Sequence, residues 1–171
     1  MNTFWGNIFK PRRDEETEVL AMLAKIPIFK DMAERDLVRI ERILHRREYR
    51  EDETIFQQGD PGLGMYIIEQ GEVSIMLMPA RQVVAELKEG EFFGELSLLD
   101  DSPRTASAIA KVPGKMLCFF QPDLFDLINL DPRMGVKLLL GLSRTIGERL
   151  KRTNEHFSML KNLKVAPEDM K

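Results

Sequence analysis

Between residues 54 and 120, connections rich in glycine and proline divide the chain into six short apolar segments. The segments read TIFQQ (54–58), MYIIEQ (65–70), EVSIMLM (72–78), VVAELK (83–88), TASAIA (105–110) and KMLCFF (115–120). Their hydrophobicity repeats every two residues, which is typical of β-strands. Short strands at such close spacing, with connections such as GDPGLG and QG between them, predict an antiparallel roll or sandwich.

Helical patterns flank the predicted strands on both sides. The N-terminal pattern covers residues 14–44, is interrupted by Pro27, and resumes after Asp31 and Glu34, which resemble a capping box. Helical character returns at Pro122. The predicted fold class is therefore α+β, with a jelly-roll-like antiparallel β-roll of about eight strands between N-terminal helices and a long C-terminal helix.

The long C-terminal helix is predicted to begin at Asp131 and Pro132, which suit the N-cap and the first helical position, and to reach about Lys164. Side chains four and three residues apart along it resemble one side of a coiled coil: Leu139, Ser143, Ile146, Leu150, Thr153, Phe157 and Leu160. Its first half can pack on the roll. Its second half extends past the expected edge of the roll, so we expect a homodimer formed through this helix. Its many basic side chains mark either a docking face or an ordinary solvated surface.

The length of 171 residues fits one domain with appended helices. The expected divisions are an N-terminal arm or helix (1–20), the roll domain (21–130), a C-terminal lid and dimerisation helix (131–165) and a tail (166–171). The net charge of −3 provides no basic field, so we expect no nucleic-acid binding by this chain alone. The single cysteine, Cys118, lies in an apolar run, which predicts a packed thiol and a reducing, cytoplasmic compartment.

The N-terminal segment MNTFWGNIFKPRR combines aromatic and basic residues. Its basic residues follow the apolar ones, so it does not resemble a secretory signal, and no apolar run in the chain approaches the length of a bilayer span. The segment is interpreted as an arm that packs on its own domain or on a partner chain. Peripheral membrane contact through residues 1–13 is the alternative.

The stretch FGELSLLDDSPRTASA, at residues 93–108, contains the candidate ligand-binding residues of the chain. FGELSLL is predicted to leave a strand and form a short helical turn whose first amides point outward, which favours a phosphate. Gly94 lets the backbone approach a ligand closely, and Ser97 is small enough to leave room beside it. Arg104 can bond a phosphate through two oxygens, whereas Glu95 can accept bonds from sugar hydroxyls. These residue types together indicate a site for a nucleotide with one phosphate.

The same stretch resembles the phosphate-binding cassette of the cyclic nucleotide-binding domain family, which includes catabolite activators and protein kinase A regulatory subunits. The residues that carry the resemblance are Phe93, Gly94, Glu95, Leu96, Ser97, Leu98, Leu99, Pro103, Arg104, Thr105, Ala106 and Ala108. Upstream, PIFKDM (27–32), GDPG (59–62) and MYIIEQGEVSI (65–75) are similar to the opening helix and roll of the family. The resemblance covers about residues 20–160 and indicates a stand-alone, bacterial-type member with a single domain.

The resemblance implies a β-roll that holds cAMP or cGMP, with the C-terminal helix as a lid. Glu95 would bond the ribose 2′-hydroxyl and Arg104 the cyclic phosphate. The amides of Gly94, Ser97 and Thr105 would complete the cradle. The residues predicted to bind the ligand are Gly94, Glu95, Leu96, Ser97, Pro103, Arg104, Thr105 and Ala106.

Two features of the resemblance concern the base. In cGMP-preferring members a hydroxyl residue directly after the arginine contacts the guanine amino group, and some cAMP-responsive members carry one too, so Thr105 permits either ligand. In members that resemble the catabolite activator, a Thr–Ser pair on the long helix touches adenine across the dimer. Thr153 and Asn154 follow Arg149 at comparable spacing and are the base-capping candidates.

The preferred hypothesis for function is a regulatory sensor module. A 3′,5′-cyclic mononucleotide would bind and move the C-terminal helix, and the movement would reach an unidentified protein partner or change the geometry of a dimer. One alternative is an interaction scaffold whose roll binds no nucleotide. Another is the effector domain of a truncated transcription regulator of the catabolite-activator type, since only APEDMK follows Val165 and no DNA-binding module is expected there.

An enzymatic function is not expected. His45 and His156 are the only histidines, and the sequence pairs neither with a nucleophile nor with a cluster of carboxylates. Asp100 and Asp101 lie in a predicted turn, where carboxylates are usually solvated. We therefore predict no catalytic residues, no metal and no cofactor, the cyclic nucleotide being a ligand.

Overall fold

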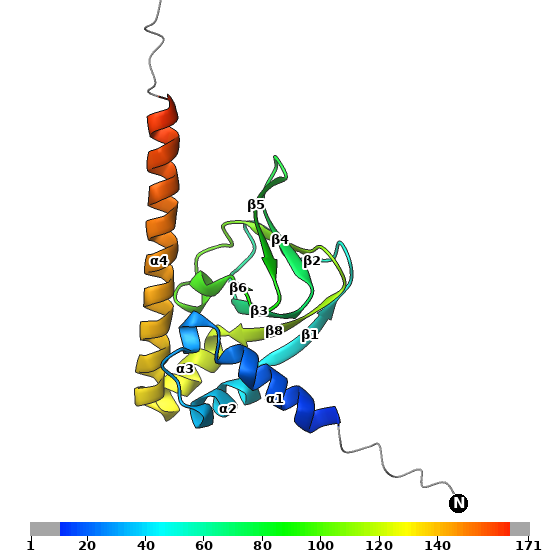
Figure 1. Cartoon of the computed structure of the whole chain (residues 1–171), viewed down its shortest axis with the longest axis vertical. Helices are drawn as coiled ribbons and strands as arrows, with labels where there is room; N and C mark the ends of the chain where they lie inside the picture. The colour runs from blue at the N-terminus through cyan, green and yellow to red at the C-terminus, as the bar shows by residue number, and fades with distance from the viewer. Residues whose placement is uncertain (1–10, 165–171) are drawn as a thin grey trace, which may run out of the picture.

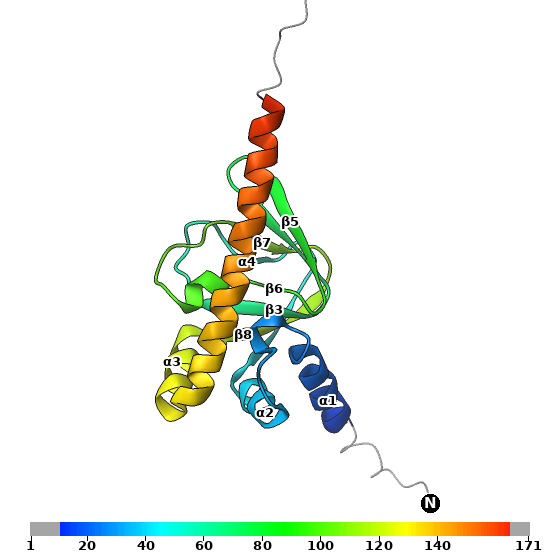
Figure 2. The same ribbon diagram turned by 60° about the vertical axis from the view of Figure 1, so that its left-hand side comes forward.

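A computed structural model describes residues 11–164, with side chains from 16 to 159, and shows a β-roll with helices packed against it (Figure 1). The elements are α1 (Pro11–Leu23), the 3-10 turn η1 (Pro27–Phe29), α2 (Glu34–Ile43), β1 (His45–Tyr49), β2 (Thr54–Phe56), β3 (Gly64–Gln70), β4 (Glu72–Leu77), β5 (Gln82–Lys88), β6 (Phe92–Phe93), the 3-10 turn η2 (Glu95–Leu98), β7 (Ser107–Ala110), β8 (Gly114–Phe120), α3 (Gln121–Leu130) and α4 (Pro132–Lys164). The first half of α4 lies with the other helices, and its last turns extend beyond the roll (Figure 2).

The strands form two four-stranded antiparallel sheets, in the orders β1-β8-β3-β6 and β2-β7-β4-β5. The predicted fold class, an antiparallel roll of about eight strands between helices, is thus confirmed. Two strands carry no alternating pattern in the sequence. β1 reads HRREY and buries only Tyr49, and β6 consists of Phe92 and Phe93 alone.

Strands β3 and β8 are buried on both faces and separate two apolar cores. The residues that face the helices are Met65, Ile67, Leu117 and Phe119, which join a core with residues of α1, η1, α2, α3 and α4. The alternate residues face the interior of the roll and are Tyr66, Ile68, Met116 and Cys118. The apolar runs in these two strands therefore reflect two buried faces rather than one. Cys118 is packed in the second core, as its sequence context predicts.

The start of α2 differs from the predicted capping box. Glu34 is the first residue of the helix, so it cannot be the third-position partner of Asp31. Instead, the amide of Ala33 donates to Oδ2 of Asp36 at 3.4 Å, and Asp31 forms an ion pair with Arg144 of α4. The box predicted from Asp31 and Glu34 is wrong because the helix begins further along the chain.

The start of α4 agrees with the sequence. Oδ1 of Asp131 accepts a bond from the amide of Met134 at 3.1 Å, as an N-cap does. Two ion pairs then attach this end of the molecule to α2: Arg39 to Asp131 at 2.6 Å and Lys137 to Asp36 at 2.8 Å. Asp36 is buried, and the hydrogen bond from Lys137 lowers the pKa of its carboxyl. These contacts fix the direction in which α4 leaves the helical layer.

The first half of α4 packs tightly on the helical layer. Leu138 and Leu142 are fully buried on its inner side. Between them Gly141 approaches η1 so closely that a Cβ there would lie 2.0 Å from the carbonyl oxygen of Ile28. A glycine is therefore required where α4 crosses η1.

The opposite side of α4 carries an outer stripe of exposed apolar residues, which are Val136, Leu140, Leu150 and Phe157. This stripe differs from the seam expected from the sequence. Leu139 of that seam packs against the helical core instead, and Leu160 lies outside the described side chains. Leu150 and Phe157 belong to both sets.

The terminal segments 1–10 and 165–171, which include half of the expected N-terminal arm or helix (1–20) and the whole expected tail, lie outside the described residues. The helix α1 runs through the expected boundary at residue 20, and its residues Val19 and Leu23 are both buried in the helical core. None of the helices described between residues 11 and 164 is long and apolar enough to cross a membrane.

Gly141→Ala is expected to destabilise the protein, because the added Cβ would force α4 away from η1. We expect the free energy of unfolding, measured by urea denaturation, to fall by about 1–3 kcal/mol. Gly147→Ala is the matched control, since its Cβ meets no atom within 4 Å and alanine favours a helix by about 1 kcal/mol over glycine. Equal stabilities of the two variants would contradict the close contact between α4 and η1.

Candidate functional site

A cleft of about 670 Å³ lies between the roll and α4, within the size range of small-molecule sites. Its floor is the cassette segment, residues 93–106, and its walls come from β4 and β5 on one side and from α4 on the other. The lining includes every residue predicted to bind a ligand: Gly94, Glu95, Leu96, Ser97, Pro103, Arg104, Thr105 and Ala106. The fold thus gathers the predicted residues around one cavity.

The cassette segment turns sharply where β6 ends. Gly94 has a φ of 75°, in the left-handed region that favours glycine, and the turn η2 follows it as the sequence predicts. A Cβ on Gly94 would lie 2.6 Å from Nη1 of Arg104. The amide of Ser97, which the resemblance assigns to the ligand, donates to the carbonyl of Gly94 at 3.2 Å. Gly94 therefore serves both the turn and the approach of the arginine.

Arg104 is a buried cation without an anionic partner. Only 6 % of the residue is exposed. Its Nη1 donates to Ser97 Oγ at 2.9 Å and to the Gly94 carbonyl at 3.2 Å, and its Nη2 donates to the Gly64 carbonyl at 2.8 Å. The guanidinium carbon lies 4.0 Å from the centre of the Phe56 ring.

A third nitrogen of this group, Nε, has no hydrogen-bond partner among the described residues, and none of their carboxylates lies within 4.0 Å of the guanidinium. Burial lowers the pKa of Arg104 from its ordinary value, because the charged form has lost its water. A buried charge that is only partly satisfied by neutral groups is unfavourable by itself. The arrangement is suited to a bound anion.

Glu95 is also buried, with 6 % of the residue exposed, and it is held by α4. Arg149 donates through Nη1 to Oε2 of Glu95 at 2.7 Å and through Nη2 to the carbonyl of Phe92 at 2.9 Å. Its guanidinium also lies 4.5 Å from the centre of the Phe92 ring. The sequence suggests Glu95 for this site but not its partner. The signal for Arg149 is its position one helical turn before Thr153, which places both on one face of the helix.

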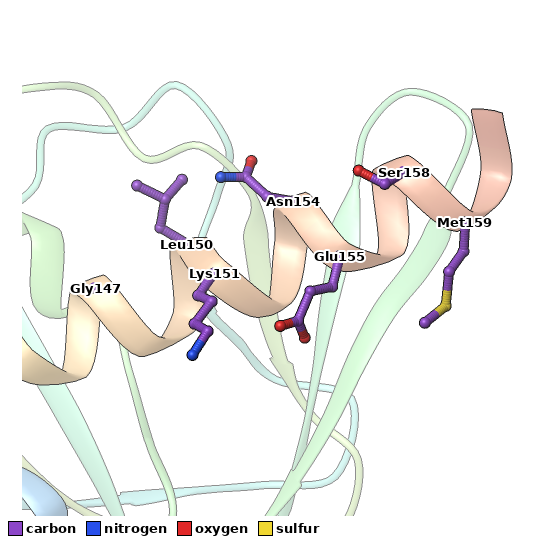
Figure 3. Close-up of a pocket in the computed structure, with 7 residues that line it drawn as sticks. All are labelled: Gly147, Leu150, Lys151, Asn154, Glu155, Ser158 and Met159. Carbon is purple, nitrogen blue, oxygen red and sulfur yellow. The ribbon is translucent and has the colours of Figure 1, made fainter. Parts of the chain in front are cut away.

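The two base-capping candidates lie on different sides of α4. Thr153 lines the cleft, and its hydroxyl donates to the carbonyl of Arg149 at 2.9 Å. Asn154 lines a separate hollow on the flank of the helix with Gly147, Leu150 and Lys151 (Figure 3). The structure therefore brings Thr153 to the cassette segment and directs Asn154 away from it.

The described residues contain no group of three histidine, cysteine or acidic side chains that could hold a metal ion. Asp100 accepts two bonds from Ser102 within its own turn. Burial raises the pKa of the Cys118 thiol to about 11, so this thiol is protonated at neutral pH.

Comparison with known proteins places this cleft in context. A sequence profile described as “Cyclic nucleotide-binding domain” matches residues 46–131, which include both β3 and the cassette segment. The chain belongs to the cyclic nucleotide-binding domain family. This family consists of regulatory nucleotide-binding domains rather than of enzymes.

Two sequence relatives illustrate the family. The Cyclic AMP receptor protein of Thermus thermophilus is 34% identical over 125 residues, which cover 71% of this chain and 58% of that protein. The cAMP-dependent protein kinase regulatory subunit of Aspergillus niger is 35% identical over 96 residues, or 56% of this chain and 23% of that subunit. The chain thus spans little more than half of the first relative and about a quarter of the second.

Solved structures of the family have the same fold. The catabolite activator protein of Thermus thermophilus superposes with a TM-score of 0.70 at 30% identity, over 79% of this chain and 63% of that one. A cyclic nucleotide-binding domain from Methylobacillus flagellatus superposes with a TM-score of 0.75 at 24% identity, over 92% of this chain and 88% of that one. The β-roll with a long C-terminal helix is therefore the family fold.

Proposed function

We propose that this chain is a regulatory sensor of a 3′,5′-cyclic mononucleotide, cAMP or cGMP, and not an enzyme. The observation that carries the proposal is the buried guanidinium of Arg104, which faces a cleft of suitable size and lacks a counter-ion among the described residues. A cyclic phosphate carries a single negative charge and two free oxygens that can accept bonds from it. The names of both sequence relatives refer to cAMP, which makes cAMP the first ligand to test.

The sugar and phosphate would lie along the cassette segment. Arg104 would neutralise the phosphate, and Oε1 of Glu95 would accept a bond from the ribose 2′-hydroxyl while Oε2 remains with Arg149. The neighbouring lining residues Leu96, Pro103 and Ala106 would supply contact surface, and backbone amides of the segment would add donors. The roles of Arg104 and Glu95 are those that the resemblance to the family implies, and both residues line the cleft.

The base would lie toward α4, where Thr105 and Thr153 both line the cleft. The proton of the Thr153 hydroxyl is already donated to the Arg149 carbonyl, so its oxygen is available as an acceptor for an amino group. Asn154 lies on the other flank of α4, so it would reach a base only in the cleft of a partner protomer.

Ligand binding would be coupled to α4 through Arg149. This side chain joins the helix directly to the carboxylate that would receive the ribose, and both residues line the cleft. A nucleotide that pulls on Glu95 would therefore change the position of the distal half of α4, whose first half is fixed to α2 by ion pairs. A shift between two positions of this half would be the signal to a partner protein or to a second protomer.

The outer stripe of α4 supports dimerisation. Val136, Leu140, Leu150 and Phe157 are exposed and are separated by 4, 10 and 7 residues, which are sums of the three- and four-residue steps of a helix–helix seam. Exposed apolar residues in a line along a helix are typical of a helix–helix interface. We therefore propose a homodimer in which two α4 helices meet along this stripe, so that Asn154 of one protomer approaches the cleft of the other.

Arg104→Ala tests the proposed ligand directly. We expect calorimetric titration of the refolded, nucleotide-free chain with cAMP and with cGMP to show binding, and the variant to lose on the order of a hundredfold in affinity or more, about 3 kcal/mol. Arg47→Ala is the matched control, because Arg47 stacks on Tyr49 outside the cleft. Absence of binding to the folded wild-type chain would contradict the sensor proposal and favour an interaction scaffold.

Glu95→Ala tests the ribose contact and the coupling together. We expect it to weaken binding of the ribonucleotide while hardly changing the affinity for its 2′-deoxy analogue, which lacks the bonded hydroxyl.

Nucleotide should alter hydrogen exchange of the amides of α4 between residues 145 and 159 in the wild type and not in the variant. An equal loss for both analogues would mean that Glu95 does not bind the ribose. Unchanged exchange in the wild type would refute the coupling.

Leu150→Glu tests the dimer. A charge in the middle of the outer stripe should convert the dimer to a monomer in sedimentation equilibrium, because it would be buried between two apolar helices. Leu130→Glu is the control, since this residue at the end of α3 is 81 % exposed and lies off the stripe. A wild-type chain that sediments as a monomer would rule the interface out.

A further inference from the structure

A second cavity, of about 360 Å³, lies between α1 and the sheet that contains β1, β8 and β3. Its lining includes Glu18 and Met22 from α1, Arg46, Glu69 and Lys115 from the strands, and Glu89 from the turn after β5. None of its lining residues belongs to the cleft beside α4. The cavity is therefore a separate site, and the proposed nucleotide site does not account for it.

The sheet side of this cavity carries a neutralised and rigid ion pair. Arg46 donates to Glu69 twice, from Nε to Oε2 at 2.7 Å and from a terminal nitrogen to Oε1 at 2.6 Å. A guanidinium held in this way presents a flat face on which an aromatic ring can stack. Met22, on the α1 side, is half-buried, and its thioether is a favourable neighbour for an aromatic ring.

Two carboxylates at this cavity are unpaired. Glu18 and Glu89 are exposed, and no side chain between residues 16 and 159 forms a hydrogen bond or ion pair with either of them. An ionised carboxylate only accepts hydrogen bonds, so the complementary group is a flat apolar ring with a donor and no acceptor. Among the aromatic side chains, the indole of tryptophan fits this description, whereas phenylalanine has no donor.

The chain contains one tryptophan, Trp5, in the segment that directly precedes α1 and lies outside the described residues. At 1.5 Å per residue, Glu18 and Met22 lie about 10 and 16 Å along α1 from Pro11. A segment that turns back within two residues and is then extended places Trp5 about 13 Å from Pro11. Trp5 can therefore reach the cavity of its own chain, between these two positions.

We propose that the cavity beside α1 is a docking site for the N-terminal segment of the same chain. The indole of Trp5 lies against Arg46 and Met22, and its N–H donates to one of the two unpaired carboxylates. The docked segment adds a contact between the start of α1 and the sheet. This inference does not depend on the proposed sensor function, because the two sites share no residue.

The fluorescence of Trp5 in the full chain tests the site, because no other tryptophan contributes to the emission. We expect emission at shorter wavelength, and weaker quenching by acrylamide, in the folded chain than in urea. The double variant Glu18→Ala, Glu89→Ala removes both acceptors and should move the emission of the folded chain toward that of the unfolded one.

The matched control is the double variant Glu51→Ala, Glu148→Ala, which removes two exposed carboxylates that do not line the cavity. It should leave the emission unchanged. Emission of the folded wild type equal to that in urea would overturn the docking. So would an equal shift in the two double variants, or no shift in the first.

A disulfide test locates the segment, because the bond forms only where two Cα atoms lie within about 7 Å of each other. With oxidised glutathione, Gly6→Cys combined with Gln70→Cys at the cavity should form a bond within one chain. The bond should be lost when Trp5→Ala is added, and Gly6→Cys with Glu51→Cys should form none. A bond between two chains would overturn docking in the same chain.

Vesicles of phosphatidylglycerol and phosphatidylcholine in equal amounts test the membrane alternative for residues 1–13. We expect their addition to leave the emission of Trp5 unchanged, because its ring is already covered. Long-wavelength emission in buffer that shortens only with the vesicles would assign the segment to a membrane surface and overturn the docking.

Discussion

The organisation of the site depends on one buried cation. Arg104 is enclosed by the carbonyl oxygens of Gly94 and Gly64, the hydroxyl of Ser97 and the ring of Phe56. These contacts orient the guanidinium without neutralising it, so the side chain is held in position at an electrostatic disadvantage. An anion that enters the cleft removes that disadvantage. The same contacts explain why position 94 holds a glycine, since any side chain there would displace the arginine.

The helix α4 is the second element on which the site depends, because its two sides have separate tasks. Its inner side is anchored by Leu138, Leu142 and the close approach of Gly141 to η1, and further along it supplies the wall of the cleft. Its outer side carries apolar residues that the domain itself leaves uncovered. In the proposed sensor, the contact near the middle of the helix, at Arg149, would act on the distal half that lies beyond it.

The sequence predicts the elements whose patterns are local. The alternating segments between residues 54 and 120 become strands, and Asp131 with Pro132 starts α4, because period and capping chemistry depend only on neighbouring residues. β1 could not be predicted in this way, because HRREY has no alternating pattern and becomes a strand by pairing with β8. The box expected at Asp31 is wrong because α2 begins at Glu34, and the carboxylate of Asp31 instead pairs with Arg144, over a hundred positions away in the chain.

In the candidate site, too, local features could be predicted from the sequence and contacts between distant residues could not. The cassette segment can be identified from its own residues, and all the residues predicted from it line the cleft. The contact between Glu95 and Arg149 could not be identified, because it joins elements 54 positions apart and depends on the path of α4. The orientation of Thr153 and Asn154 likewise depends on the rotation of the helix about its axis, which its anchoring to α2 and η1 determines.

The ion pair between Glu95 and Arg149 has a thermodynamic consequence for whatever contacts α4. When two ligands bind to sites that share one structural element, their affinities are linked. If the first ligand changes the affinity for the second by some factor, the second changes the affinity for the first by the same factor. A protein that grips the distal half of α4 in one position would alter the affinity of the cleft by the same factor by which an occupant of the cleft alters its own. Through α4, a partner protein would therefore affect nucleotide binding in the cleft as strongly as the nucleotide affects binding of the partner.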